Sequence, residues 1–125
     1  MIEFKLNEQG LIPAVVQDAV TGEVLMVAYM NKESLAETFK RKLTCFYSRS
    51  RNEFWVKGES SGHTQEVVEI LTDCDQDTLL IKVKQKGGAC HLGYKSCFVR
   101  SLDNKGDLAK ITQKKIFDPE KIYKK

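Results

Sequence analysis

Residues 67–84, VVEILTDCDQDTLLIKVK, carry the clearest structural signal in the chain, because two runs of β-favouring residues flank a polar centre. Each run, Val67–Leu71 and Thr78–Lys84, has the composition and two-residue periodicity of a strand. Three more segments of this kind follow the same pattern, and they are Thr44–Ser48, Phe54–Val56 and Ser96–Val99. The separators are polar or glycine-rich and hold no crossover helices, so the pattern predicts an antiparallel sheet.

The first third of the chain predicts a hairpin and a helix. Leu11–Val16 and Val24–Met30 are apolar runs joined by a turn at Thr21-Gly22, and Pro13 favours an edge position for the first of them. Asn31 then offers an N-cap, and apolar residues recur at four-residue spacing, namely Leu35, Phe39 and Leu43. We expect one helix near residues 32–42 and a fold of the mainly β (α+β) class.

Length and composition indicate a single globular domain over residues 1–125. The chain is 42% hydrophobic and 30% charged, which is typical of a folded protein of this size. Val24–Met30 is the longest apolar run and is too short to span a bilayer, and the N-terminus has no secretory signal pattern. We therefore expect a cytoplasmic protein without a membrane partner.

The net charge of +3 comes from the C-terminal end. Residues 100–125 hold eight Lys or Arg against four Asp or Glu, so this segment carries +4 and the rest of the chain −1. Lysine pairs such as Lys114-Lys115 and Lys124-Lys125 are more often solvated ends than nucleic-acid contacts. We expect an unassigned basic tail and no nucleic-acid partner.

Four cysteines are present, and their spacing leaves two kinds of zinc site open. Cys74, Cys90 and Cys97 are separated by 16 and 7 residues, without a Cys-x-x-Cys pair. A closed site with four thiolates would have to recruit Cys45, which stands beside two aromatic residues and is interpreted as a buried structural thiol. The alternative is three thiolates and an open position for a water molecule.

The polar centre of residues 67–84 adds a second kind of metal ligand. Asp73, Asp75 and Asp77 alternate with other residues, so in an extended segment they would project from one face while Cys74 points to the other. Thr78 stands where an EF-hand loop has glycine, which argues against calcium sensing. A few carboxylates suit magnesium, which commonly engages a phosphate.

Other polar residues suit a phosphorylated ligand. The guanidinium groups of Arg49 and Arg51 match phosphate geometry. A second segment combines an aromatic residue, a cation, small residues and a histidine, and its candidate contacts are Trp55, Lys57, Glu59, Ser60, Ser61 and His63. His91 follows Cys90; in a strand the two side chains would diverge, which leaves His91 as a base or a substrate contact.

Residues 11–98 resemble the phosphoribosyl-AMP cyclohydrolase family of histidine biosynthesis. The resemblance is carried, in order, by Tyr29-Met30-Asn31, Ser48-Arg49-Ser50-Arg51, Trp55-Val56-Lys57-Gly58-Glu59, Ser61-Gly62-His63, Asp73-Cys74-Asp75-Gln76-Asp77, Cys90-His91-Leu92-Gly93 and Ser96-Cys97-Phe98. It implies a small antiparallel, barrel-like sheet in an intertwined homodimer. Residues 100–125 match nothing assignable and are too short for a fused second enzyme domain.

The resemblance implies hydrolysis of the N1–C6 bond of the adenine ring in N1-(5-phosphoribosyl)-AMP, using zinc-activated water and magnesium. The implied ligands are Cys74, Cys90 and Cys97 for zinc, at the dimer interface, and Asp73, Asp75 and Asp77 for magnesium; the zinc ligands could come from one chain or from both. His91 is the implied base or proton shuttle. Two rival classes fit less well. A zinc-stabilised nucleic-acid-binding module is disfavoured because the clustered aspartates would repel the phosphate backbone. A zinc deaminase is disfavoured because its His-x-Glu and Pro-Cys-x-x-Cys motifs do not occur in this sequence.

Overall fold

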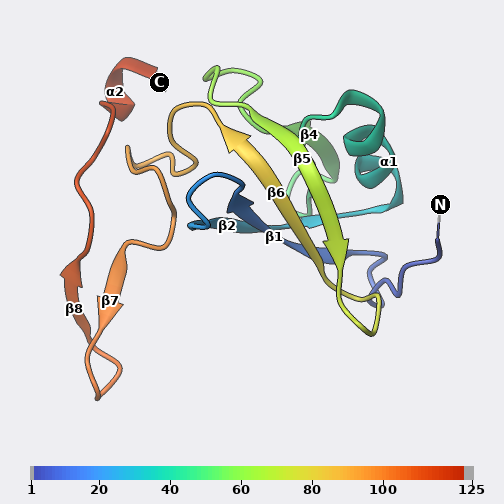
Figure 1. The fold of residues 1–125 in the computed structure, drawn as a ribbon, viewed down its shortest axis with the longest axis horizontal. Coiled ribbons are helices and arrows are strands. Elements are labelled where there is room, and N and C mark those ends of the chain that lie inside the picture. The colour runs from blue at the N-terminus through green and yellow to red at the C-terminus, as the bar shows by residue number, and fades with distance from the viewer. Residues whose placement is uncertain (1, 123–125) are drawn as a thin grey trace.

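A four-stranded sheet forms the centre of the structure, which is a computed structural model that describes residues 2–122 (Figure 1). Its strands are β1 (Ile12–Asp18), β2 (Val24–Met30), β5 (Gln65–Thr72) and β6 (Leu79–Gln85), in the order β2-β1-β6-β5. The predicted Lys124 and Lys125 of the basic tail lie outside the described residues.

The sheet is mixed rather than antiparallel. β1 and β2 form the expected hairpin, but β1 pairs in parallel with β6, with Ala14 opposite Leu79. The predicted edge position of Pro13 is also wrong, because β1 is an inner strand. Pro13 is accommodated because pairing with β6 begins only at the next residue, so its missing N–H interrupts no bond of that ladder.

The predicted helix is confirmed as α1 (Lys32–Arg41). Asn31 caps it through a reciprocal pair of bonds, in which its side chain accepts from the Ser34 N–H at 2.8 Å and the Ser34 hydroxyl accepts from the Asn31 N–H at 2.9 Å. Lys42 ends the helix in the left-handed conformation, with φ of 59°. The helix leads directly into the hairpin of β3 (Cys45–Ser48) and β4 (Glu53–Val56).

The core lies between this sheet, α1 and the β3–β4 hairpin. Leu79, Ile81 and Val83 of β6 are fully buried, as is Phe46 of β3, and they pack in one apolar cluster with β1 and β2. Cys45 is fully buried as well, which agrees with its interpretation as a structural thiol. Burial raises the pKa of the Cys45 thiol, so it stays neutral in this environment.

The C-terminal end is structured beyond the expectation from sequence. The predicted strand Ser96–Val99 is wrong, because the strand begins only after this segment, as β7 (Arg100–Leu102), and pairs with β8 (Leu108–Ile111). A short helix, α2 (Pro119–Ile122), follows. The described strands form one four-stranded and two two-stranded sheets, so a closed barrel is not confirmed. Within residues 2–122, no helix has the length and apolar character needed to cross a membrane.

Thr38 joins α1 to β3 inside the core, and its removal tests this connection. Its hydroxyl donates to the Ser34 carbonyl at 2.8 Å and accepts from the Cys45 N–H at 2.9 Å, and Thr38 is fully buried. Thr38→Val keeps the shape but leaves that N–H without a partner, so we expect a loss of about 1–3 kcal/mol in the free energy of unfolding. Urea denaturation measures this loss. Glu37→Gln, which removes only an exposed ion pair with Arg41, is the control and should leave stability almost unchanged.

Candidate metal and substrate site

The three alternate aspartates lie in the turn between β5 and β6, not in an extended segment. The Asp73 carboxylate accepts a hydrogen bond from the Asp77 N–H at 3.1 Å, and Gln76 has a positive φ of 60°. A carboxylate that binds backbone a few residues ahead closes a turn, which explains why the alternation did not continue as a strand. The turn still gathers the carboxylates, because one oxygen from each of Asp73, Asp75 and Asp77 lies within 4.8 Å of the others.

This carboxylate cluster has the donor chemistry for a hard cation. The hydrogen bond with Asp73 is the largest cause that raises the pKa of Asp77, and the negative charges of its neighbours add to it. For Asp73, desolvation acts to raise the pKa, but hydrogen bonds from Asp77, Thr78 and Gln76 together outweigh it and lower the pKa. A bound divalent cation would remove this repulsion, and all-oxygen ligands suit magnesium.

Cys90 and His91 lie in a tight loop rather than in a strand. The Ala89 N–H donates to the Lys95 carbonyl at 2.8 Å, and the Cys90 N–H donates to the Tyr94 carbonyl at 3.1 Å. The predicted divergence of the two side chains in a strand therefore does not apply. His91 is exposed at the tip of the loop, immediately after the buried Cys90.

The same loop brings Cys90 and Cys97 together. The two side chains interact electrostatically, and although Cys97 is exposed as a residue, its sulfur is partly buried. Burial of the sulfur, followed by the neighbouring Cys90, raises the pKa of Cys97 to about 11. Two neighbouring thiols in one loop are a suitable pair of ligands for a soft metal such as zinc.

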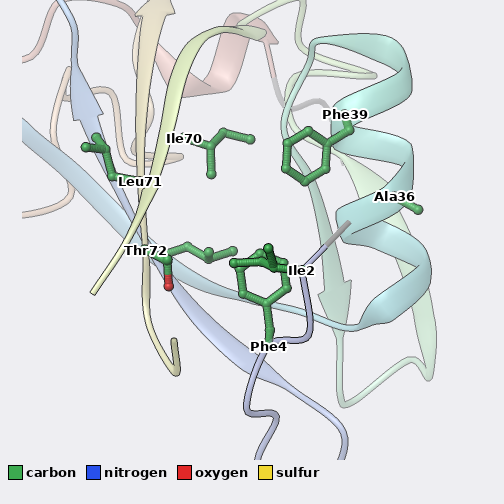
Figure 2. A pocket seen from close by; sticks show the side chains of 8 residues that line it. Ile2, Phe4, Ala36, Phe39, Ile70, Leu71 and Thr72 are labelled. Carbon is green, nitrogen blue, oxygen red and sulfur yellow. The ribbon is translucent and has the colours of Figure 1, made fainter. Parts of the chain in front are cut away.

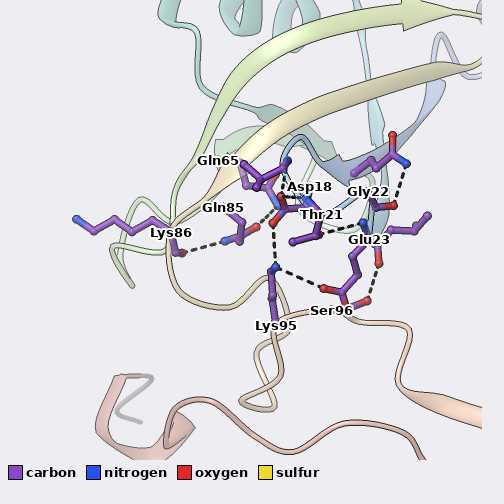
Figure 3. Close-up of polar contacts among 12 residues, drawn as sticks. Asp18, Thr21, Gly22, Glu23, Gln65, Gln85, Lys86, Lys95 and Ser96 are labelled. Carbon is purple, nitrogen blue, oxygen red and sulfur yellow. Dashed lines mark hydrogen bonds and ion pairs between the residues drawn. The ribbon is translucent and has the colours of Figure 1, made fainter.

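Polar contacts attach the thiol loop, residues 89–97, to the β1–β2 hairpin (Figure 3). The Lys95 ammonium lies 2.9 Å from the Asp18 carboxylate and 3.5 Å from that of Glu23. The Ser96 hydroxyl donates to the Val24 carbonyl at 2.7 Å. The Cys97 N–H donates to the Leu25 carbonyl, also at 2.7 Å, so the second thiol is held directly against β2.

The C-terminal segment also contacts the thiol loop. The Ile116 N–H donates to the Gly93 carbonyl at 2.7 Å, and a Cβ added at Gly88 would lie 2.6 Å from the Phe117 ring. The Phe117 ring also meets the His63 ring edge to face, with centroids 4.5 Å apart. The His63 Nδ1 atom is buried and makes no hydrogen bond within the described residues. Residues 116–117 thus link His63 to the thiol loop.

Lys57 reaches the thiol loop from the end of β4. Its ammonium donates to the Ala89 carbonyl at 2.7 Å and lies 5.8 Å from the centre of the Trp55 ring. Desolvation by burial lowers the pKa of Lys57, while Cys97 and Cys90 act electrostatically in the opposite direction. Lys57 and the two thiols therefore share one partly buried environment.

Cys74 does not join the other two thiols in this chain. It is exposed in the carboxylate turn before β6, whereas Cys90 follows β6 at its opposite end (Figure 1). A strand of this length spans about 23 Å at about 3.3 Å per residue. Among residues 2–122, only the three aspartates bring three potential metal ligands together.

The remaining predicted contacts lie on the β3–β4 hairpin and the loop after it. Arg49 is exposed at the hairpin tip, with its guanidinium 4.9 Å from the centre of the Tyr29 ring. Arg51 is exposed at the same tip, and its N–H donates to the Ser48 hydroxyl at 3.3 Å. The loop after β4 holds the exposed Glu59 and Ser60 and the half-buried Ser61.

A separate groove between α1 and β5 has a volume of about 530 Å³ (Figure 2). Its lining is Ile2, Phe4, Ala36, Phe39, Ile70, Leu71, Thr72 and Leu79, so one hydroxyl is its only polar side-chain group. It contains none of the predicted site residues. Phe39, which the helical spacing placed on the packed face, is 47% exposed here.

A thiol pair beside a lysine, with a separate carboxylate turn, defines a candidate metal-dependent enzyme. Comparison with known sequences gives the family: the family model described as phosphoribosyl-AMP cyclohydrolase matches residues 26–99. The phosphoribosyl-AMP cyclohydrolase of Chlorobium limicola is 57% identical over 122 residues, covering 97% of this chain and 88% of the relative. That of Pelotomaculum thermopropionicum is 56% identical over 122 residues, covering 98% and 94%. The chain belongs to the phosphoribosyl-AMP cyclohydrolase family and is a hydrolase.

The ion pair of Asp18 and Lys95 gives the thiol loop a pH-dependent support. Desolvation acts to raise the pKa of Asp18, but hydrogen bonds from Lys95, Thr21 and Val20 lower it below the ordinary value of 3.8. A carboxylate whose pKa is lowered by folding stabilises the protein at pH values above its unfolded-state pKa. This stabilisation is lost as the pH falls through the folded-state pKa. We therefore expect Asp18→Asn to destabilise the protein most near pH 6 and progressively less below about pH 4.

Urea unfolding of metal-free wild type and variant at each pH measures this difference. Asp107→Asn is the matched control, since it removes the same charge from an exposed turn far from Lys95 in sequence. A difference between wild type and Asp18→Asn that stays constant from about pH 6 to about pH 3 would contradict the assignment.

Proposed function

We propose that this protein hydrolyses the N1–C6 bond of the adenine ring in N1-(5-phosphoribosyl)-AMP and opens the ring, a step of L-histidine biosynthesis. The observation that carries the proposal is the Cys90–Cys97 thiol pair, which lies inside the family match. Relatives with the name of this activity align with nearly the whole chain. We propose the cytoplasm as its compartment, because thiols that serve as metal ligands require reducing surroundings.

We further propose a homodimer in which Cys74 of one chain joins Cys90 and Cys97 of the other around one zinc ion. Two observations support this arrangement. The thiols lie at opposite ends of β6 within a chain, so one chain alone does not gather three sulfurs. Cys74 and Cys97 are both exposed, which leaves them accessible to a second copy.

Zinc held there would supply a Lewis acid that makes a water molecule nucleophilic near neutral pH. Hydrolysis places the oxygen of that water on C6, breaks the C6–N1 bond and leaves a proton on N1. His91 is exposed directly after Cys90, so we assign it the transfer of protons between the water and N1. The thiol loop is attached to β2 and β1, and this attachment holds the thiol pair and His91 in place, which reduces the entropy cost of the reaction.

The carboxylate turn is the proposed magnesium site, with Asp73, Asp75 and Asp77 as ligands. Its oxygens are clustered, exposed and repulsive in the absence of a cation, which supports this assignment. Magnesium bound by few carboxylates keeps positions for substrate phosphate oxygens. Residues of the β3–β4 hairpin and of the loop after β4 complete the proposed substrate contacts, and they are Arg49, Arg51, Trp55, Glu59, Ser60, Ser61 and His63.

The activity is tested by incubating the metal-analysed protein with phosphoribosyl-AMP and following absorbance and mass. We expect a product heavier by one water with no ammonia released, whereas ammonia would indicate a deaminase instead. Cys97→Ala should lose zinc and activity together, because half of the thiol pair is removed. Asp75→Ala should lose magnesium dependence and keep zinc. A fully active Cys97→Ala protein without zinc would exclude this mechanism.

Mixing two inactive variants tests the shared zinc site. A dimer of one Cys74→Ala chain and one Cys97→Ala chain contains one intact site and one site with both defects. After unfolding and refolding an equal mixture, half of the dimers are mixed, so about one quarter of wild-type activity and zinc should return. Each variant refolded alone is the control. No recovery in a mixture that forms mixed dimers would place all zinc ligands within one chain.

A further inference from the structure

We propose that Lys57 is a positioning residue for the thiol pair. Its ammonium group is the fixed counter-charge of Cys90 and Cys97 when these two cysteines hold zinc. This inference rests on the proposed zinc function of these cysteines. The composition of residues 55–63 favoured a different role for Lys57, namely contact with a phosphate of the substrate.

The geometry directs Lys57 to the thiol loop. Its ammonium lies 2.7 Å from the carbonyl oxygen of Ala89, the residue bonded to Cys90. It also interacts electrostatically with the sulfurs of both Cys90 and Cys97. One hydrogen bond therefore fixes the position of the loop and brings a positive charge to the two sulfurs at the same time.

The backbone before and after Lys57 keeps its side chain in this direction. The Lys57 N–H donates to the Thr44 carbonyl at 3.0 Å, which extends the pairing of the β3–β4 hairpin. Gly58 follows with a positive φ of 81°, and a Cβ there would lie 2.3 Å from the His63 backbone. Only glycine fits this position, so the loop turns away immediately after Lys57 and leaves its side chain beside Trp55.

The charge of Lys57 is not engaged by a carboxylate. Of the ion pairs recorded for residues 2–122, none includes Lys57, whereas Lys95 of the thiol loop pairs with both Asp18 and Glu23. Lys95 thus serves the attachment of the loop to the β1–β2 hairpin. Lys57 is half-buried and interacts electrostatically with both cysteines, so its charge acts where water screens it poorly.

A counter-charge is what a three-thiolate zinc site requires. Zinc carries two positive charges and three thiolates carry three negative ones, so the group has a net charge of −1. That excess weakens the effect of the metal on a bound water, and a nearby ammonium offsets it. The Lys57 ammonium at this position would stabilise the metal-loaded thiol pair, and Lys57 itself would take no part in the bond changes.

Zinc affinity measured by competition with a chelator tests this role in the full-length dimer. Lys57→Met keeps the length of the side chain but removes charge and donor, and Lys57→Gln keeps a donor without charge. We expect both to weaken zinc binding by about 10- to 100-fold, with Lys57→Arg within a few-fold of wild type. Lys84→Met, which removes an exposed lysine of β6, is the control for net charge and should bind zinc as wild type does.

The outcomes separate the roles that Lys57 can play. Unchanged zinc affinity in Lys57→Met with a raised KM would overturn the proposal in favour of a phosphate contact. Wild-type affinity in Lys57→Gln would also overturn it, because the hydrogen bond alone would then suffice. If Lys57→Met fails to fold, Arg and Gln at this position still give the comparison. Failure of the wild-type cysteines to bind zinc would instead reject the proposed function itself.

Discussion

The pairing of β6 with a neighbour on each side is the constraint on which both candidate metal sites depend. Leu79, Ile81 and Val83 are buried on one face, so a shift of one residue in register would turn all three outward. The parallel ladder with β1 and the antiparallel ladder with β5 therefore fix β6 along its length. Its start carries the carboxylate turn and its end carries the thiol loop, which is why the two ligand sets are separated.

Local features were predictable from sequence because neighbouring residues determine them. The helix followed from its cap and spacing, and the strands from alternation. The direction of β1 relative to β6 was not predictable, since alternation defines the faces of a strand and not the orientation of its partner. The carboxylate turn was misjudged for a related reason: Asp73 binds backbone within its own turn, and such a contact competes with an extended conformation.

The sequence points to the residue types of the candidate site but not to the residues that hold them in place. Cysteine and aspartate indicate a metal site by residue type alone, because their side chains are common metal ligands. Lys57, Asp18 and Lys95 are ordinary charged residues whose partners lie far away in sequence. Lys57 reaches Ala89 across 32 positions. Such contacts exist only once β4 and the thiol loop are brought together, so the electrostatics of the site is a property of the fold.

The contact of residues 116–117 with the thiol loop bears on where the catalytic unit ends. The family match stops at residue 99, yet Ile116 is bonded to Gly93 and the Phe117 ring lies against Gly88 and His63. A fragment ending at that boundary would retain every cysteine and histidine of the chain and the three clustered aspartates, but it would lose these contacts to the thiol loop and to His63. The segment by which the family is recognised is thus shorter than the body that shapes its site.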